Sequence, residues 1–233
     1  MKPKRAPDVI ARGQIYANVG LHMVGALAEP LAVAWHCIRI SGFQAGQKAL
    51  ILGAGPIGLA ILLLLKLWGA EKTIITEVTE ERIRQARMFE ADMVINPIAS
   101  IGATVNPVLA GVAELTRDGV DVAFDCTDLQ STLDTALQAV KPGGTVFNVA
   151  IHDKPPALNL NDIAVLEKRL LGGICYTAED FEAVIAAMAS GAIPFEKMVT
   201  AVVPLNEVVE GGFQALIKNK AQQVKILIQP NTA

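Results

Sequence analysis

The chain has little of the chemistry that several protein classes need. Only 3 of its 233 residues are cysteines and only 3 are histidines. Cys37, Cys126 and Cys175 form no C-x-x-C pair, so the sequence gives no support for a disulfide framework or a local zinc knuckle. We expect three small buried thiols in a reducing compartment, and therefore a cytoplasmic location.

Charge and long apolar runs are also scarce. Charged residues make up 18% of the chain and its net charge is −3, which argues against a general nucleic-acid surface. The longest apolar run, Leu59–Leu65, ends at Lys66, far short of the ~18 residues that a membrane span needs. The start, MKPKRAP, lacks the apolar stretch of a signal peptide. We therefore expect neither nucleic acid nor a membrane as a partner.

The chain is rich in hydrophobic residues, which make up 52% of it, and these residues recur in a regular order. Strand-like segments alternate mostly with helical patterns, which predicts βαβ units and a parallel sheet. The six predicted strands are 49–52, 73–77, 93–96, 120–126, 145–151 and 170–176. Right-handed crossovers then give the order 3-2-1-4-5-6 of an α/β, doubly wound, six-stranded Rossmann sheet.

The sequence divides into three predicted regions. They are a loop-like N-terminal segment (1–25), a dinucleotide-binding Rossmann domain (26–190) and a short C-terminal extension (191–233). The Rossmann domain is expected to open with a helix over 28–40, with a proline in its first turn. Within the extension we expect two strands, 200–203 and 224–228, and a helix that begins near Asn206.

The stretch QKALILGAGPIG passes from a predicted strand through a glycine-rich turn into a helix. Its G-x-G-x-x-G spacing is typical of a dinucleotide-binding unit. Gly53 allows the tight turn, Gly55 lets a pyrophosphate approach the backbone, and Gly58 lets the helix pack close to the strand. Pro56 and Ile57 open the helix, whose free N–H groups and dipole form an anion site.

A carboxylate and a guanidinium follow at the distance expected for the adenosine end of such a site. Glu77 closes the second predicted strand, 24 residues beyond Gly53, where a carboxylate accepts hydrogen bonds from the ribose hydroxyls. It would repel a 2′-phosphate by on the order of a few kcal/mol, so we expect NAD as the cofactor. Arg82 lies five residues further on and would compensate, which keeps NADP open as the less favoured alternative.

Further candidates follow the fourth and fifth predicted strands. A doubly wound sheet binds its ligand outside the carboxyl ends of the strands, where the strand order reverses. Cys126 and the backbone groups of Ala150 and Ile151 are therefore candidates for contacts with the nicotinamide half. His152 follows in the same crevice and is a candidate acid–base group.

Other titratable groups have weaker claims. Asp128 is equally suited to be the N-cap of the next helix. His36 lies inside a predicted helix and is expected to pack rather than to react. The sequence contains no H-E-x-x-H motif and no G-x-S-x-G nucleophile elbow.

Five segments together carry a resemblance to a known family. They are ALAEPLAVAWH (Ala26–His36), LILGAGPIGLA (Leu50–Ala60), AVKPGGTV (Ala139–Val146), CYTAEDFEAVI (Cys175–Ile185), and VEGGFQALIKNK followed by VKILI near the end. With them the chain resembles the medium-chain dehydrogenase/reductase family, the zinc-type alcohol dehydrogenase superfamily. It is most similar to the 2,3-butanediol and sorbitol dehydrogenase branch.

The resemblance implies hydride transfer between a secondary alcohol and NAD⁺, with a zinc ion that polarises the alcohol oxygen. It implies cofactor roles for the three glycines, Glu77 and Arg82. It also implies that Glu29, in the AEPL motif, ligates the zinc directly or through its water, which makes Glu29 a catalytic candidate beside His152. Family members carry a further N-terminal domain that supplies a cysteine and a His-Glu pair to the zinc. None of these ligands is recognised in this sequence, and residues 1–24 do not resemble the end of that domain. We therefore expect a shortened member without the zinc site, and its C-terminal segment as a remnant of the catalytic domain.

Three functions stay open from the sequence. The first is an NAD(H)-binding alcohol or polyol dehydrogenase that acts on a small molecule. For this shortened form the sequence does not decide whether zinc-dependent hydride transfer takes place. The second is a non-redox cyclase, isomerase or lyase that uses His152, Asp128 or Tyr176 as acid–base groups. The third is a non-catalytic interaction subunit. We also expect a homodimer through the edge of the sixth strand, as the family often forms.

Overall fold

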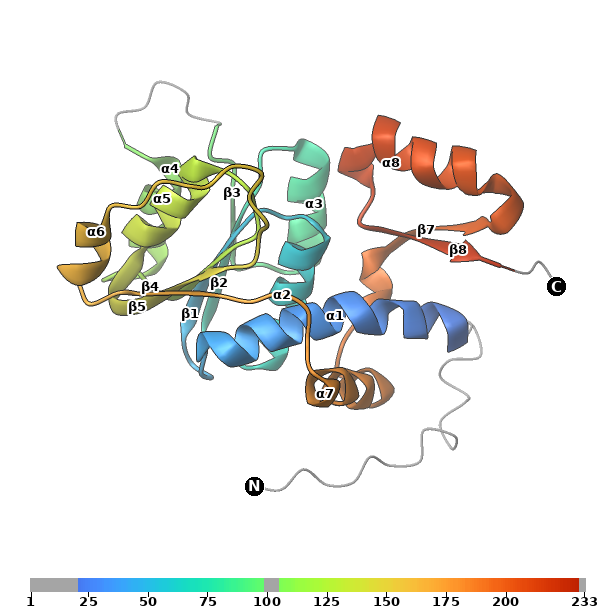
Figure 1. The fold of residues 1–233 in the computed structure, drawn as a ribbon, viewed down its shortest axis with the longest axis horizontal. Helices are drawn as coiled ribbons and strands as arrows, with labels where there is room; N and C mark the ends of the chain where they lie inside the picture. Colours follow the sequence, from blue (N-terminus) through green and yellow to red (C-terminus); the bar gives the residue numbers. More distant parts are fainter. Residues whose placement is uncertain (1–20, 99–104, 231–233) are drawn as a thin grey trace.

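A six-stranded parallel sheet forms the centre of the structure (Figure 1). The computed structural model describes residues 21–98 and 105–230. The strands are β1 (Lys48–Leu52), β2 (Lys72–Thr76), β3 (Met93–Ile95), β4 (Val120–Asp125), β5 (Val140–Asn148) and β6 (Arg169–Gly172). Their order is β3-β2-β1-β4-β5-β6, and every neighbouring pair is parallel. The predicted doubly wound Rossmann sheet is therefore confirmed.

Helices cover both faces of the sheet. They are α1 (Leu21–Ser41), α2 (Pro56–Leu67), α3 (Glu80–Met88), α4 (Pro107–Leu115), α5 (Gln130–Ala139), α6 (Leu160–Ala164) and α7 (Ala178–Ala189). Successive side chains of β1 point to opposite faces. Ile51 therefore packs with α1, α2 and α7, whereas Leu50 and Leu52 pack with α4 and α5. Because α2 is buried from Gly58 to Leu65, the apolar run that follows the glycine turn is a core helix.

A small second sheet lies beside the Rossmann domain (Figure 1). It pairs β7 (Val199–Pro204) with β8 (Lys225–Gln229) in parallel, close to the two strands predicted there, and follows a 3₁₀ turn, η2 (Phe195–Met198). A helical segment does begin near Asn206, as expected, but it is not one regular α-helix. The chain instead forms a 3₁₀ turn, η3 (Leu205–Glu207), a π-helix, η4 (Val208–Gln214), a short α8 (Ala215–Lys218) and a 3₁₀ turn, η5 (Lys220–Gln222). A Cβ at Gly211 would lie 2.8 Å from Val203, so close packing on β7 determines this backbone more than helix propensity does.

Helix α1 begins earlier than the sequence predicts. Residues 21–25, expected as part of a loop, are helical, and Gly25 and Pro30 lie inside the helix. From Leu27 onward α1 contributes many fully buried side chains to the core, and this packing outweighs the poor helix propensity of glycine and proline. The rest of the predicted N-terminal loop, residues 1–20, lies outside the described residues, and the predicted domain boundaries stay predictions.

Three further local expectations from the sequence are wrong. The fifth strand, expected over 145–151, begins earlier as β5 and includes the Lys141–Gly144 segment, and its pairing with β4 contains an irregular register step. Leu129 rather than Asp128 is the N-cap residue of α5. Strand β6 ends at Gly172, and Cys175 has a φ of 61°, a left-handed conformation that does not continue a strand.

The cysteines differ from one another more than expected. Cys37 is buried, and burial raises the pKa of its thiol to about 12. Cys126 is half-buried, and Cys175 is exposed. The expectation of three buried thiols is therefore met by Cys37 and is wrong for Cys175, whereas the half-buried Cys126 still has its thiol shielded from solvent. The described residues also contain no helix that is long and apolar enough to cross a membrane.

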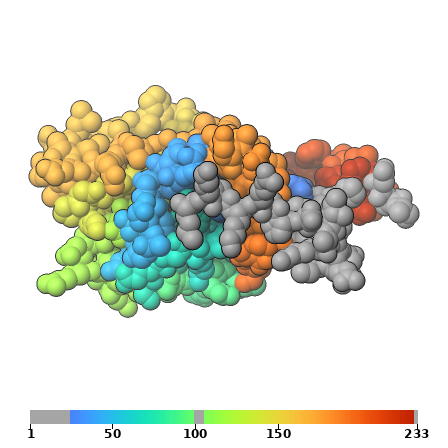
Figure 2. Space-filling view, turned by 90° about the horizontal axis from the view of Figure 1, so that it is seen from below, coloured from blue at the N-terminus to red at the C-terminus, as the bar shows by residue number. Residues whose placement is uncertain are grey.

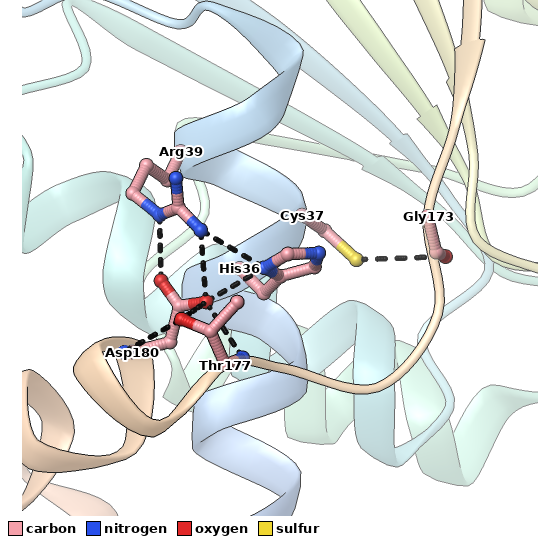
Figure 3. Close-up of polar contacts among 6 residues, drawn as sticks. All are labelled: His36, Cys37, Arg39, Gly173, Thr177 and Asp180. Atoms are coloured by element: carbon pink, nitrogen blue, oxygen red, sulfur yellow. Dashed lines mark hydrogen bonds and ion pairs between the residues drawn. The ribbon is translucent and has the colours of Figure 1, made fainter.

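A buried carboxylate joins α1 to α7, two helices that adjoin on one face of the molecule (Figure 2). Asp180 is 1% exposed and accepts two hydrogen bonds from Arg39, Nε to Oδ1 at 2.6 Å and Nη2 to Oδ2 at 3.0 Å. His36 Nδ1 lies 2.6 Å from Oδ2 (Figure 3). Thr177 donates to the same oxygen from its backbone N–H and its hydroxyl. The Asp180 N–H donates in return to Thr177 Oγ1 at 3.4 Å, which completes a capping box at the start of α7. We call these four residues the Asp180 cluster.

The charge of Asp180 is stabilised by its donors. Burial alone would raise the pKa of this carboxyl, but hydrogen bonds from Arg39, Thr177 and His36 outweigh burial and hold the pKa well below its usual value of 3.8. A group whose pKa is lowered by folding stabilises the folded state above its unfolded pKa. That stabilisation is lost as the pH falls through the folded-state pKa.

We predict that Asp180→Asn lowers the free energy of unfolding at pH 7 by about 2 kcal/mol. This is less than the ~3–5 kcal/mol of a fully buried pair, because Arg39 is nearly half exposed, at 46%. Chemical denaturation measures the difference, with Glu182→Gln, an exposed carboxylate on the same helix, as the control. The difference in the free energy of unfolding between wild type and Asp180→Asn is expected to decrease as the pH falls below about 4. A difference that stays constant down to pH 2 would contradict this account.

Candidate functional site

The turn between β1 and α2 is built around two glycines. Gly53 has a φ of +98°, in the left-handed region, and a Cβ there would lie 2.9 Å from Thr127 Cγ2. A Cβ at Gly58 would lie 2.0 Å from the Gly53 carbonyl oxygen. Helix α2 therefore starts directly against the end of β1, and only glycine at position 58 permits this. This geometry matches the tight turn and the close helix packing that the sequence predicts.

The middle of the turn is open. Gly55 is the N-cap residue of α2, no side chain caps the helix, and Pro56 stands in its first turn. Apart from Gly55 and its two neighbours in the chain, no atom of the described residues lies within 4 Å of a Cβ built on Gly55, and Gly55, Pro56 and Ile57 are all half-exposed. The first N–H groups of a helix have no intrahelical partner, so this end of α2 offers donors to an anion.

Glu77 follows β2 and reaches the glycine turn with its carboxylate. It is 8% exposed. Its Oε2 accepts a hydrogen bond from the Ala54 N–H at 3.2 Å, and its Oε1 accepts from the N–H groups of Val78 and Thr79 at 2.9 and 3.1 Å. Arg82 Nη1 lies 3.8 Å from Oε2. Glu77 therefore fixes the turn after β1 to the start of α3, a structural role that the sequence did not predict.

The ends of β1, β4 and β5 are joined by backbone hydrogen bonds. The Cys126 N–H donates to Leu52 O at 3.0 Å, and the N–H groups of Val149 and Ala150 donate to Asp125 O at 2.9 and 3.2 Å. The structure therefore brings Cys126 and Ala150 to the same edge of the sheet as the glycine turn. Burial raises the pKa of the Cys126 thiol, which makes this cysteine a poor nucleophile.

A buried acid below this edge, in the loop expected near the nicotinamide ribose, was given no role from the sequence. Asp125 is fully buried and accepts hydrogen bonds from Thr127 N and Oγ1 at 3.1 and 3.0 Å and from Thr132 Oγ1 at 3.3 Å. Burial raises the pKa of Asp125, while these bonds oppose the shift. In the sequence, only the position of Asp125 at the end of the fourth predicted strand indicated a possible site residue. Its hydrogen-bond partner Thr132 lies on the next helix and could not be paired with it.

His152 stands at the rim of the same edge. Its Nε2 lies 3.1 Å from Asn148 Oδ1, and Asn148 Nδ2 donates to the Ala150 carbonyl oxygen at 2.8 Å. Asn148 therefore orients the imidazole through its side chain. Ile151, beside His152, is 74% exposed, so this side of the edge is open to solvent.

Several candidates are not brought together. Glu29 is exposed on α1, and no hydrogen bond or ion pair within the described ranges joins it to the glycine turn or to His152. Tyr176 stacks on Phe181 with the ring centroids 5.5 Å apart. In the part of the chain that the structure describes, His152, Asp128 and Tyr176 share no hydrogen bond, so the geometry does not favour a non-redox acid–base site.

Residues 21–98 and 105–230 contain no group of three or more His, Cys, Asp or Glu side chains that would hold a metal ion. A catalytic zinc takes three protein ligands and keeps one open position. The described residues therefore do not fit the zinc that the resemblance implies, and Glu29 alone does not replace a ligand set.

We predict that Gly58→Ala destabilises the fold by about 3 kcal/mol or more, because the methyl group would collide with the Gly53 carbonyl oxygen. The matched control is Gly55→Ala, where φ is −73° and the space is open. That change is expected to alter the free energy of unfolding by less than about 1 kcal/mol. Chemical denaturation of both variants tests this, and equal stabilities would show that α2 does not depend on glycine at position 58.

Comparison with known proteins places the chain in a family. Residues 56–190 match the model of the zinc-binding dehydrogenase family. A (R,R)-butanediol dehydrogenase of Saccharomyces cerevisiae is 40% identical over 212 residues, which cover 89% of this chain and 55% of that protein. The crystal structure of 2R,3R-butanediol dehydrogenase from Bacillus subtilis is 37% identical, with a TM-score of 0.81, and the match covers 88% of this chain and 57% of that one.

A zinc-binding dehydrogenase from Sinorhizobium meliloti bound to NADP is also similar. It has a TM-score of 0.74 at 28% identity, over 89% of this chain and 59% of that one. The chain spans about half the length of the curated relatives it matches. The family match nevertheless covers more than half of the chain, from the helix after the glycine turn to the end of α7. The chain belongs to the zinc-binding dehydrogenase family.

Proposed function

We propose that this chain binds a nicotinamide dinucleotide and forms the nucleotide-binding part of an alcohol or polyol dehydrogenase. The observation that supports this proposal most directly is the open turn at Gly55. The start of α2, without a side-chain cap, lies on one side of it and the Glu77 carboxylate on the other. The pyrophosphate would accept hydrogen bonds from the N–H groups at the start of α2. The adenosine ribose would lie toward Glu77, and the nicotinamide toward Cys126, Ala150 and Ile151.

Glu77 supports a preference for NAD(H). Its carboxylate is buried and already accepts three backbone N–H bonds, and it would face the ribose as a hydrogen-bond acceptor. A 2′-hydroxyl donates to such a group, whereas a 2′-phosphate is repelled by it. The relative from Sinorhizobium meliloti holds NADP, so the preference within this family depends on local residues such as Glu77 and Arg82.

The substrate class follows from the relatives. Several of them are butanediol or sorbitol dehydrogenases, which supports a secondary alcohol of a small diol or polyol as the hydride donor. His152 at the rim, oriented by Asn148, is the proposed acceptor of the hydroxyl proton. We assign no step to zinc, because the described residues supply no ligand set, and Glu29 keeps only the role implied by the resemblance.

We further propose a homodimer through the outer edge of β6. In the described part of the chain β6 pairs only with β5, so one row of its backbone N–H and C=O groups is unpaired. Leu171 and Ile174 add exposed apolar surface beside this edge, at 38% and 60%. Strands β7 and β8 pair with each other and leave the β6 edge open to a second copy.

Titration calorimetry tests the cofactor proposal. We expect NADH to bind at least about tenfold more tightly than NADPH, since one charge repulsion of ~1.4 kcal/mol already gives that factor. Glu77→Gln is expected to bring the two affinities within about threefold of each other. Glu80→Gln, an exposed carboxylate in the first turn of α3, is the control and should keep the preference. Absence of binding of both dinucleotides at millimolar concentration would overturn the proposal.

Sedimentation or light scattering tests the dimer. Leu171→Lys is expected to shift wild-type dimers to monomers, because it places a charge beside the pairing edge. Ile217→Lys changes a residue of α8 that is 73% exposed and should leave the dimer intact. A wild-type protein that stays monomeric at about 100 μM would refute the assembly, since even a Kd of about 10 μM would leave most of it dimeric there.

A further inference from the structure

The C-terminal part of the chain contacts α3 through main-chain atoms. Arg82 Nη2 donates a hydrogen bond to Lys220 O at 3.4 Å, and Gln85 Nε2 donates to Gln222 O at 3.1 Å. Both carbonyl oxygens belong to η5, Lys220–Gln222, which we call the docking segment. Figure 1 shows α3 facing this part of the chain. The docking segment contributes only backbone carbonyl oxygens to these two bonds, and the donors are side chains of α3. Substitutions on α3 can therefore remove the bonds without changing the docking segment itself.

Arg82 takes part in two interactions at once. Its Nη1 lies 3.8 Å from Glu77 Oε2, while its Nη2 bonds the docking segment. Its side chain is 17% exposed and that of Glu77 is 7% exposed. The guanidinium therefore stands between the proposed ribose acceptor and the C-terminal part of the chain. A guanidinium that binds a phosphate with two parallel N–H bonds uses the same donors.

Gln85 contacts the docking segment without touching the proposed nucleotide site. Its Nε2 faces Gln222 O, and its Oε1 is buried with no hydrogen-bond partner among the described residues. Rotation of the amide would place Oε1 against the Gln222 carbonyl oxygen, so the donor orientation is fixed by the docking segment. No hydrogen bond of the described residues joins Gln85 to Glu77 or to the glycine turn. Gln85 therefore offers a means to loosen the segment without altering the groups proposed to bind nucleotide.

We propose that the docking segment competes with a 2′-phosphate for Arg82 and so adds to the preference for dinucleotides with a free 2′-hydroxyl. This inference rests on the proposed nucleotide site. With the segment docked, Arg82 is held between Glu77 and Lys220 O and leaves the ribose hydroxyls to Glu77. A 2′-phosphorylated dinucleotide draws the guanidinium to its phosphate, and the hydrogen bond to Lys220 O is lost.

The size of this effect is set by one hydrogen bond. Lys220 O also accepts from the Gln223 N–H at 3.3 Å, so it keeps a partner when Arg82 leaves. The net contribution of such a bond corresponds to a factor of about three to ten in an equilibrium constant. Coupling between two binding events is reciprocal, so loosening the docking segment raises NADPH affinity relative to NADH by the same factor.

The test uses the full chain with Gln85→Met, which is close in size to glutamine and removes the donor to Gln222 O. Calorimetry with NADH and NADPH gives the affinity ratio, and hydrogen exchange of residues 219–224 reports docking of the segment. We expect faster exchange in this variant and a ratio shifted toward NADPH by about three- to tenfold. The shorter side chain of Gln85→Asn does not reach the Gln222 carbonyl oxygen, so this variant should show the same faster exchange and the same shift of the affinity ratio. Arg84→Met is the control, because Arg84 is exposed and, among the described residues, forms an ion pair with Glu81 alone.

Two outcomes would overturn the inference. One is faster exchange at 219–224 with an unchanged NADH-to-NADPH ratio, which would show that docking and cofactor choice are independent. The other is unchanged exchange in both Gln85 variants. Failure of the wild-type chain to bind either dinucleotide would instead overturn the proposed function itself, so the two failures are distinguishable.

Discussion

The contact between Gly58 and the Gly53 carbonyl oxygen determines the geometry on which the proposed site depends. It places the first turn of α2 against the end of β1, and α2 is then buried on nearly all sides. A helix buried in this way is packed at close contact with the sheet along its length. Glu77 secures the other side of the turn through Ala54 N–H, so the open position at Gly55 is fixed between two rigid elements.

Two buried carboxylates organise the domain in the same physical way. Glu77 and Asp180 are 8% and 1% exposed, and each is surrounded by N–H donors and an arginine. Donors of this kind compensate an ion for the water that it loses on burial. The difference lies in position. Asp180 joins α1 to α7 on one face, whereas Glu77 stands at the crevice and is linked through Arg82 to the C-terminal part of the chain.

The strand order and the glycine turn were predictable because their signals are local. Apolar runs, glycine spacing and the offset to Glu77 lie in the sequence itself, and parallel topology then follows from few rules. The Asp180 cluster joins residues 144 positions apart, and Gln85 meets a backbone oxygen 137 positions away. The hydrophobic periodicity of a sequence does not predict contacts between residues so far apart. Helix α1 began earlier than predicted because burial of its later turns outweighs Gly25 and Pro30, and Cys175 proved exposed because its backbone turns out of β6.

Family membership and the described geometry together favour a nucleotide-binding role more strongly than any step of the hydride transfer, since no zinc ligand set lies among the described residues. The central claim is that the turn at Gly55 holds a pyrophosphate while Glu77 faces the adenosine ribose. A crystal structure of the chain with NADH tests this most directly. We expect the pyrophosphate at the N-terminus of α2 and a ribose hydroxyl within about 3 Å of a Glu77 carboxylate oxygen. NADH bound elsewhere, with the Gly53–Gly58 turn unoccupied, would contradict the account.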